Sequence, residues 1–197
     1  MKFNTARPKD LGMLFVVGGP GGSGSSTISK LLAQKYSLNY VYAGKIMRTV
    51  AKEKGFSNLE DFLKTLNSKN SDKIDEVIDR KLIRLSYSEN VLIESKIFAA
   101  LAFKLAIPTT VSIWLDAKVD VRAKRKLKSK KGKTIEEIKK ELNERLEYDN
   151  KRYTKLYGID YMSPKKYNDI VLDTSKMNEY QTLALILKLI EDGGYIK

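Results

Sequence analysis

Residues 13–27 read Met13-Leu-Phe-Val-Val-Gly-Gly-Pro-Gly-Gly-Ser-Gly-Ser-Ser-Thr27 and join three structural signals. The continuous apolar run Met13–Val17 predicts a strand buried on both faces, as in a parallel sheet. The glycines that follow allow successive backbone N–H groups to converge on an anion. The pattern then predicts an amphipathic helix whose apolar face holds Ile28, Leu31, Leu32 and Tyr36. Strand, glycine-rich turn and helix together predict a phosphate-binding loop, and the alternative is a turn with only a structural role.

The loop follows the P-loop spacing with one departure. In the frame Gly19-x-x-x-x-Gly24, Ser26 occupies the position whose hydroxyl normally binds Mg²⁺. The position before it, which is Lys in that pattern, is Ser25. If the loop binds the phosphates of a nucleotide, another cation must neutralise the β- and γ-phosphates.

The rest of the chain alternates between strand-like and helix-like patterns. Further strand candidates are 39–42, 91–93, 111–115 and 170–172. Helical patterns lie between them. One stripe consists of Ile74, Val77, Ile78, Leu82 and Leu85, with Asn70 and Ser71 as possible caps. The pattern predicts a single α/β domain with a mostly parallel sheet.

Two more helices have clear end signals. Thr134-Ile-Glu-Glu137 is a capping box that opens a charged helix expected to run to about Tyr153. The apolar residues of 183–190 predict a closing helix that stops at Gly193-Gly194.

Composition restricts the possible chemistry. The 197 residues include 37 Lys and Arg against 24 Asp and Glu, a net charge of +13, and no Cys or His. Disulfides, thiol nucleophiles, imidazole bases and Cys or His metal ligands are therefore excluded. The positive charge favours anionic partners such as phosphates, although part of it is expected to be solvated surface. Because no signal peptide or membrane span is predicted, we expect a soluble cytoplasmic protein with no membrane partner.

Two intervals between strands are longer than a usual crossover. About 48 residues follow Tyr42 before Val91, and about 54 follow Leu115 before Ile170. We expect both to hold inserted helices above the binding crevice at the strand ends, where they could act as lids.

The second insertion gathers basic residues. Residues 122–133 contain eight Lys or Arg and no acid. The helix after them places Arg145, Asp149 and Arg152 on one face, because their spacings are four and three. Two guanidiniums beside a carboxylate can clamp a transferring phosphoryl group. The alternative is a solvated helix with ordinary ion pairs.

Other charged candidates lie near two predicted strand ends. Arg48, one turn into the helix after the second strand, could hold a second phosphate, or it could be a surface charge. Glu94 ends the third strand, where a carboxylate can bind Mg²⁺ through water, and Lys96 could meet a phosphate. The alternative reading of Glu94 and Lys96 is a simple charge pair at a strand end.

Taken together, these elements resemble the nucleoside monophosphate kinases and, more narrowly, the archaeal-type cytidylate kinases. The resemblance extends from about Leu14 to Thr174. Besides the loop, it rests on Tyr42-Ala-Gly-Lys-Ile-Met-Arg48, Ala51-Lys-Glu-Lys-Gly55, Ile74-Asp-Glu-Val-Ile-Asp79, Val91-Leu-Ile-Glu-Ser95, Trp114-Leu-Asp-Ala117, Val121-Arg-Ala123, Arg152-Tyr153, Tyr157-Gly-Ile-Asp160 and Val171-Leu-Asp-Thr-Ser175. Archaeal members often carry Thr or Ser at the P-loop Lys position, so Ser25 agrees with the resemblance.

The resemblance implies a P-loop three-layer sandwich with a five-stranded parallel sheet and helices on both faces. A monophosphate-binding insertion at about 44–88 and a lid at about 122–157 are expected within one domain, 1–197. The implied reaction is phosphoryl transfer from ATP to CMP, with dCMP as a further acceptor. The partners are then ATP with Mg²⁺ and the monophosphate, and we expect a monomer or dimer that does not bind nucleic acid.

The resemblance also assigns roles to residues. ATP phosphates are bound by Gly19, Pro20, Gly21, Gly22, Ser23, Gly24, Ser25, Ser26 and Thr27. Ser26 lies near Mg²⁺, and Arg48 holds the acceptor phosphate. Arg145, Asp149 and Arg152 form the lid group that closes on the transferring phosphoryl group. The family usually has Gly-Arg after the strand-end Glu, where this chain has Ser95-Lys96, so bidentate recognition is not available there.

Other functions remain open on the residues alone. An AMP or UMP kinase would share the loop and the lid, because the nucleobase contacts cannot be placed. An RNA- or ribosome-associated P-loop NTPase could use the basic surface, although aromatic residues do not interleave with its lysines.

Overall fold

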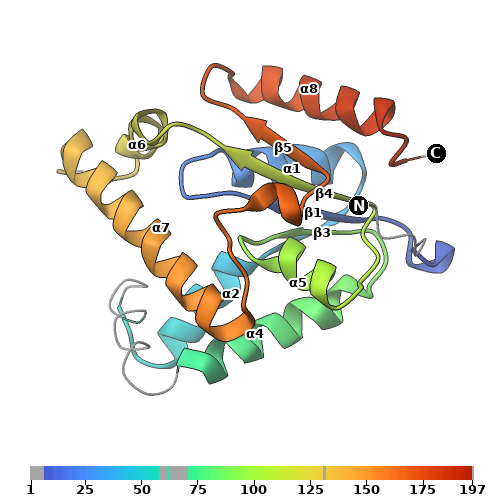
Figure 1. Ribbon diagram of the computed structural model, residues 1–197, viewed down its shortest axis with the longest axis horizontal. Helices are drawn as coiled ribbons and strands as arrows, with labels where there is room; N and C mark the ends of the chain where they lie inside the picture. The colour runs from blue at the N-terminus through green and yellow to red at the C-terminus, as the bar shows by residue number, and fades with distance from the viewer. Residues whose placement is uncertain (1–6, 58–61, 63–70, 131, 197) are drawn as a thin grey trace.

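The computed structural model of the chain describes residues 7–57, 62, 71–130 and 132–196 (Figure 1). Its five strands form one sheet in the order β2-β3-β1-β4-β5. They are β1 (Leu14–Gly18), β2 (Asn39–Tyr42), β3 (Val91–Glu94), β4 (Val111–Asp116) and β5 (Ile170–Asp173). Every neighbouring pair is parallel. The α/β class and the five-stranded parallel sheet are thus confirmed.

The helices follow the strands in the expected alternation. They are α1 (Ser25–Lys35), α2 (Ala43–Glu53), α4 (Ser71–Ser86), α5 (Phe98–Lys104), α6 (Val119–Leu127), α7 (Ile135–Tyr157) and α8 (Glu179–Asp192). Two short 3-10 turns, Lys9–Leu11 and Pro164–Lys166, lie outside this framework. Both long intervals hold inserted helices, as expected from their length.

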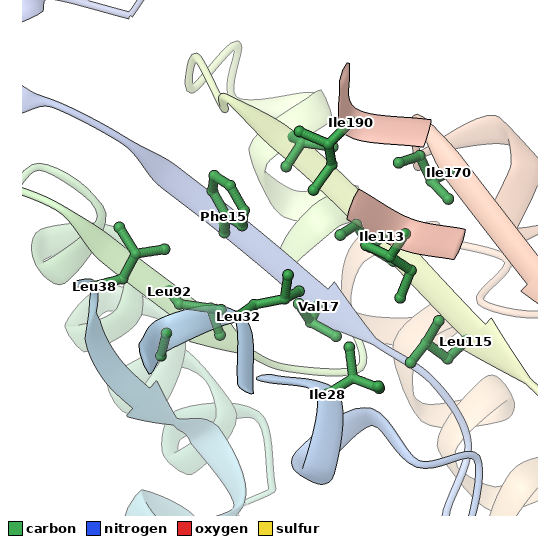
Figure 2. Packing of buried hydrophobic residues seen from close by; sticks show 13 residues of the cluster. Phe15, Val17, Ile28, Leu32, Leu38, Leu92, Ile113, Leu115, Ile170 and Ile190 are labelled. Atoms are coloured by element: carbon green, nitrogen blue, oxygen red, sulfur yellow. The ribbon is translucent and has the colours of Figure 1, made fainter. Parts of the chain in front are cut away.

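The central strand β1 shows why the sheet is covered on both sides. All five of its residues are buried. Phe15 and Val17 pack in one apolar cluster with α1 and α8, part of which Figure 2 shows. Leu14 and Val16 point to the other face and pack against α4 and α5. An apolar strand without alternation therefore belongs between two helical layers, and each fully buried large side chain contributes about 1.5–3 kcal/mol.

Helix α7 runs past the end of the sheet at which the glycine loop turns (Figure 1). The predicted capping box is present, with the Thr134 hydroxyl accepting from the Glu137 N–H. The first turns of α7 pack on α6 through Ile138 and Leu142. Its last turns join an aromatic cluster around Trp114. Anchoring at both ends places the middle of α7 over the strand ends.

Two predictions about helices need correction. Helix α7 continues past Tyr153 to Tyr157 and ends at Gly158, whose φ of 58° is left-handed. In α4 the predicted stripe is confirmed at Ile78 and Leu82, which are buried, and is wrong at Val77, which is 61% exposed. Asp75 and Asp79 share the buried face with Ile78 and Leu82. The apolar pattern missed these two acids because both have partners inside the protein. The possible cap Asn70 lies outside the described residues.

Candidate active site

The cleft lies at the carboxyl ends of β1, β2 and β3, where an open α/β sheet ordinarily binds ligands. Its volume is about 830 Å³. The glycine loop forms one wall, and α2, α4, α6 and α7 contribute the others. This size suits a small-molecule ligand.

The glycine loop has the backbone geometry of an anion site. Gly19 has φ 153°, and a Cβ there would lie 2.2 Å from the Leu115 carbonyl oxygen. Gly22 has φ 86°, and its Cβ would lie 2.7 Å from the Arg122 carbonyl oxygen. Only glycine fits these two positions. Helix α1 then begins without a side-chain cap and without an acid in its first turn, so its N–H groups are left for an anion.

Part of the loop faces the cleft. Among the predicted phosphate-binding residues, those lining the cavity are Gly19, Pro20, Gly21, Gly22, Ser25 and Ser26. Ser23, Gly24 and Thr27 complete the turn without lining it; Ser23 is buried and Thr27 is exposed. The loop therefore presents its backbone and two hydroxyls to a ligand.

Glu94 connects the loop to the edge of β3. The hydroxyls of Ser25 and Ser26 both donate to Glu94 Oε1, at 3.2 and 2.6 Å. The Tyr40 hydroxyl donates to the other carboxylate oxygen. Burial and then the bond to Glu94 raise the pKa of Tyr40, so it stays a donor. Sequence reasoning missed Tyr40, whose only signal was its place in a weak strand.

The oxygens of Ser26 and Glu94 fit a hard cation such as Mg²⁺. Glu94 is 5% exposed and turns its carboxylate toward the loop. The described residues contain no group of three or more acidic side chains able to enclose a metal ion. An ion bound there would take further ligands from nucleotide phosphates and water, as Mg²⁺ usually does.

Asp149 is the centre of a second charged cluster. Its carboxylate is fully buried and accepts from Lys96 Nζ at 2.5 Å and from Arg145 Nε at 3.1 Å. Arg152 Nη2 lies 3.4 Å from its other oxygen. The structure thus brings Lys96, at the end of β3, to the three residues that the helix spacing grouped together. Lys96, Arg145 and Arg152 line the same cleft as the glycine loop.

The charged groups of this cluster shift one another's pKa values. Burial raises the pKa of Asp149, but the three cations outweigh it and hold that pKa below its ordinary value. Burial lowers the pKa of Lys96, Asp149 raises it, and Arg145 and Arg152 lower it again, so the net direction is down. The Lys96–Asp149 ion pair, at 2.5 Å, is the shortest contact of the cluster.

Arg152 is held more completely than its sequence position indicates. It is 7% exposed, and its Nη1 lies 3.2 Å from Asp75 Oδ1 in addition to the Asp149 contact. Its Nη2 also donates to the Tyr153 hydroxyl. Asp75 of α4 thus adds a second acidic contact to Arg152, beside the one from Asp149. Asp75 could not have been assigned from a helical pattern alone.

Helices α2 and α4 contribute further residues to the cleft. Arg48 is exposed, lines the cavity and lies with its guanidinium carbon 5.0 Å from the centre of the Tyr42 ring. Asp79 lines the same region and accepts from the Tyr157 hydroxyl. Burial raises the pKa of Asp79 to about 6, although the bond from Tyr157 opposes the rise. Apolar walls come from Met47, Ile78 and Leu82.

Two arginines of the basic run contact the outer side of the glycine loop. Arg122 Nε donates to the Ala117 carbonyl at 2.9 Å, and its Nη1 lies 3.4 Å from the Gly21 carbonyl. Arg125 donates to the Ser23 carbonyl at 3.1 Å and to the Thr174 carbonyl at 2.7 Å. These two guanidiniums hold the loop against α6 and β5. Sequence reasoning left them within an unassigned run.

Similarity to known proteins extends over nearly the whole chain. The family model for the AAA domain matches residues 17–143. A protein named cytidylate kinase from Pyrococcus horikoshii is 39% identical, over 93% of this chain and 91% of its own length. Another of that name from Methanopyrus kandleri is 35% identical, over 92% of this chain and 94% of its own length.

Solved structures of lower identity share the fold. A shikimate kinase from Acinetobacter baumannii, solved in complex with shikimate, has a TM-score of 0.61 at 14% identity, covering 93% of this chain and 96% of its own. A shikimate kinase from Aquifex aeolicus has a TM-score of 0.56 at 20% identity, covering 92% and 98%. Within the described part of the chain, no helix has the length and apolar character needed to cross a membrane.

Proposed function

This chain belongs to the cytidylate kinase family, and from that premise we propose how its cleft transfers the γ-phosphoryl group of ATP to CMP. The products are ADP and CDP. A phosphate oxygen of CMP forms a bond to the γ-phosphorus while the bond from that phosphorus to the β,γ-bridging oxygen breaks. The acceptor is already an anion, so the reaction needs placement and charge neutralisation more than a base. The absence of His and Cys is compatible with this chemistry.

The glycine loop and the start of α1 bind the ATP phosphates in this proposal. Their N–H groups face an anion without competition from a cap or an acid. Ser26 and Glu94 would hold Mg²⁺, which supplies positive charge to the β- and γ-phosphates when bound. Glu94 already orients the Ser26 hydroxyl at 2.6 Å, and Tyr40 keeps the carboxylate in place from the neighbouring strand.

The acceptor lies on the other side of the cleft. Arg48 and Lys96 bind the CMP phosphate, with Arg48 entering from α2 and Lys96 from the end of β3. Arg145 and Arg152 then meet the charge that develops on the transferring oxygens, while Asp149 orients both. The single observation that carries the proposal is this Asp149 cluster, which joins Lys96 to two lid arginines in the cleft that the glycine loop also lines.

Closure of α7 over the bound nucleotides would exclude water, so that ATP is not hydrolysed wastefully. The ribose 2′-hydroxyl has no part in this scheme, and we propose dCMP as a second acceptor. The substrates are free nucleotides of the cytoplasm in this proposal, and the enzyme needs no nucleic acid. It would act as a monomer or a dimer.

The test is a panel of acceptors measured side by side. ATP with Mg²⁺ is offered with CMP, dCMP, UMP or AMP, and ADP formation is followed together with the diphosphate product. We expect the highest kcat/KM for CMP, with dCMP also converted. ATP hydrolysis without an acceptor should be much slower than transfer. Preference for UMP or AMP, or hydrolysis stimulated by RNA with no transfer to any monophosphate, would contradict the proposal.

A further inference from the structure

The glycine loop lacks a cation of its own. Residues 18–27 contain neither Lys nor Arg, because Ser25 occupies the usual Lys position. The Ser25 side chain is neutral, and its hydroxyl donates to Glu94. A triphosphate bound here would nevertheless place several negative charges against the loop. A Lys or Arg from elsewhere in the fold would have to supply the positive charge at this place.

Three basic residues near the loop are held by contacts with other parts of the protein. Lys96 is held on Asp149 at 2.5 Å, on the acceptor side. Arg122 and Arg125 donate to backbone carbonyls behind the loop. Lysines of the basic run also reach the cleft.

The structure divides that run into two groups. Lys126, Lys130 and Lys133 line the cleft, whereas Lys124 and Lys128 are exposed and do not line it. Lys130 Nζ lies 3.2 Å from Glu141 Oε2, and Lys133 pairs with the other oxygen of the same carboxylate. Glu141 thus anchors these two lysines on α7.

Lys126 reaches the loop at Gly21. A Cβ at Gly21 would lie 3.5 Å from its Cε and 3.9 Å from its Nζ. The end of the Lys126 side chain therefore lies beside the loop backbone at Gly21. Helix α6 is also fixed at this point, because the Arg122 backbone packs directly on Gly22 and Arg122 lies one turn before Lys126.

We propose that Lys126 takes the part of the absent P-loop lysine and neutralises the β- and γ-phosphates of bound ATP. The inference rests on the ATP site of the proposed function and names a further residue of that site. Its side chain approaches the loop from α6 rather than from the start of α1. A lysine is well suited to this task, because its ammonium is a point charge on a flexible stem and needs no fixed fork of donors.

The test compares Lys126→Ala with Lys124→Ala, a matched loss of one positive charge on the same helix. Affinities for ATP, ADP and AMP are measured by calorimetry without any acceptor, and kcat is measured with ATP and CMP. We expect Lys126→Ala to weaken ATP binding about tenfold and to lower kcat on the order of 10²–10³-fold. AMP, which lacks the β- and γ-phosphates, should bind as it does to the wild type. Lys124→Ala should change each value by less than about twofold.

Two further variants separate charge from packing. Lys126→Arg should retain most of the ATP affinity, because it keeps the charge. Installing the usual lysine through Ser25→Lys should restore kcat in the Lys126→Ala background. An unchanged ATP affinity and kcat in Lys126→Ala, or an equal loss of AMP affinity, would overturn the inference. So would a double variant no faster than Lys126→Ala when Ser25→Lys alone stays active.

The two proposals fail in different ways. If the wild type transferred no phosphoryl group to any monophosphate, the proposed reaction would be wrong. The comparison of ATP with AMP affinity would still test Lys126, because it uses no acceptor. Melting temperatures of all variants show whether each one is folded before its affinity is interpreted, and replacement of Lys126 or Lys124 should change stability by no more than about 0.5 kcal/mol.

Discussion

The replacement Asp149→Asn tests the charged cluster most directly, because it keeps the shape of the side chain and removes its charge. Three cations surround this carboxylate: Lys96 at 2.5 Å, Arg145 at 3.1 Å and Arg152 at 3.4 Å. In the variant their only other acidic partner among the contacts described is Asp75, which lies 3.2 Å from Arg152. We therefore expect loss of both stability and activity.

The expected loss of stability depends on how deeply each partner of Asp149 is buried. Removing one member of a buried ion pair typically costs about 3–5 kcal/mol. The Lys96 and Arg145 side chains are 27% and 31% exposed, so water can solvate them in the variant, and Arg152 retains Asp75. The expected loss is thus about 2–3 kcal/mol, which lowers the melting temperature of a chain of this size by roughly 5–10 °C. Displaced guanidiniums should also lower kcat about 10²-fold.

The pH dependence provides an independent check. The pKa of Asp149 is lower in the folded protein than in the unfolded chain, whose value is about 3.9. Its contribution to stability is therefore fully present above about pH 4 and is lost as the pH falls through the folded pKa. The difference in unfolding free energy between wild type and variant should be constant from about pH 5 to 7 and shrink below about pH 4.

Urea denaturation across this pH range, followed by circular dichroism, measures the difference. Glu147→Gln is the matched control, because Glu147 is an exposed acid on the same helix and should change stability by no more than about 0.5 kcal/mol. A loss below about 1 kcal/mol for Asp149→Asn, or a loss that did not vary between pH 7 and pH 3, would refute the reasoning.

Three other substitutions separate the parts of the site. Arg152→Ala should lower kcat about 10²–10⁴-fold and leave the Kd for ATP largely unchanged, and an unchanged kcat would remove this residue from the mechanism. Arg48→Ala should raise KM for CMP about 10–100-fold with little change in KM for ATP, since a hydrogen bond to a charged group contributes about 1.5–3 kcal/mol; equal effects on both substrates would contradict its place on the acceptor side. Asp79→Asn should stabilise the protein above about pH 6, because the folded pKa of about 6 exceeds the usual 3.8 and the native state loses stability as the pH rises between the two values. The difference between the two pKa values corresponds to at most about 3 kcal/mol of unfolding free energy. Denaturation at pH 4 and pH 8 measures it, and a variant equally destabilised at both pH values would contradict the prediction.

Local patterns were sufficient for the framework of the fold. The apolar run before the glycines, the capping box at Thr134 and the paired glycines after α8 each act within a few residues, so they can be read without knowing what packs against them. Val77 shows where such patterns fail. A buried helix face is usually apolar, but α4 buries two acids whose partners come from α7, and no local pattern includes those partners.

In the candidate site, too, spacing along the chain predicts some residues and misses others. The loop at 19–27 and the grouping of Arg145, Asp149 and Arg152 follow from spacing along the chain, because a turn and a single helix set their geometry. Other contacts depend on how β3, α6 and α7 pack. They include the ion pair of Lys96 with Asp149, 53 residues away, and the approach of Lys126 to Gly21.

By itself the sequence determined the class of chemistry, since it contains a phosphate-binding loop and neither Cys nor His. Only the tertiary structure decided which of its many positive charges face that loop. Electrostatic interactions depend on distance and on the surrounding medium, and folding sets both.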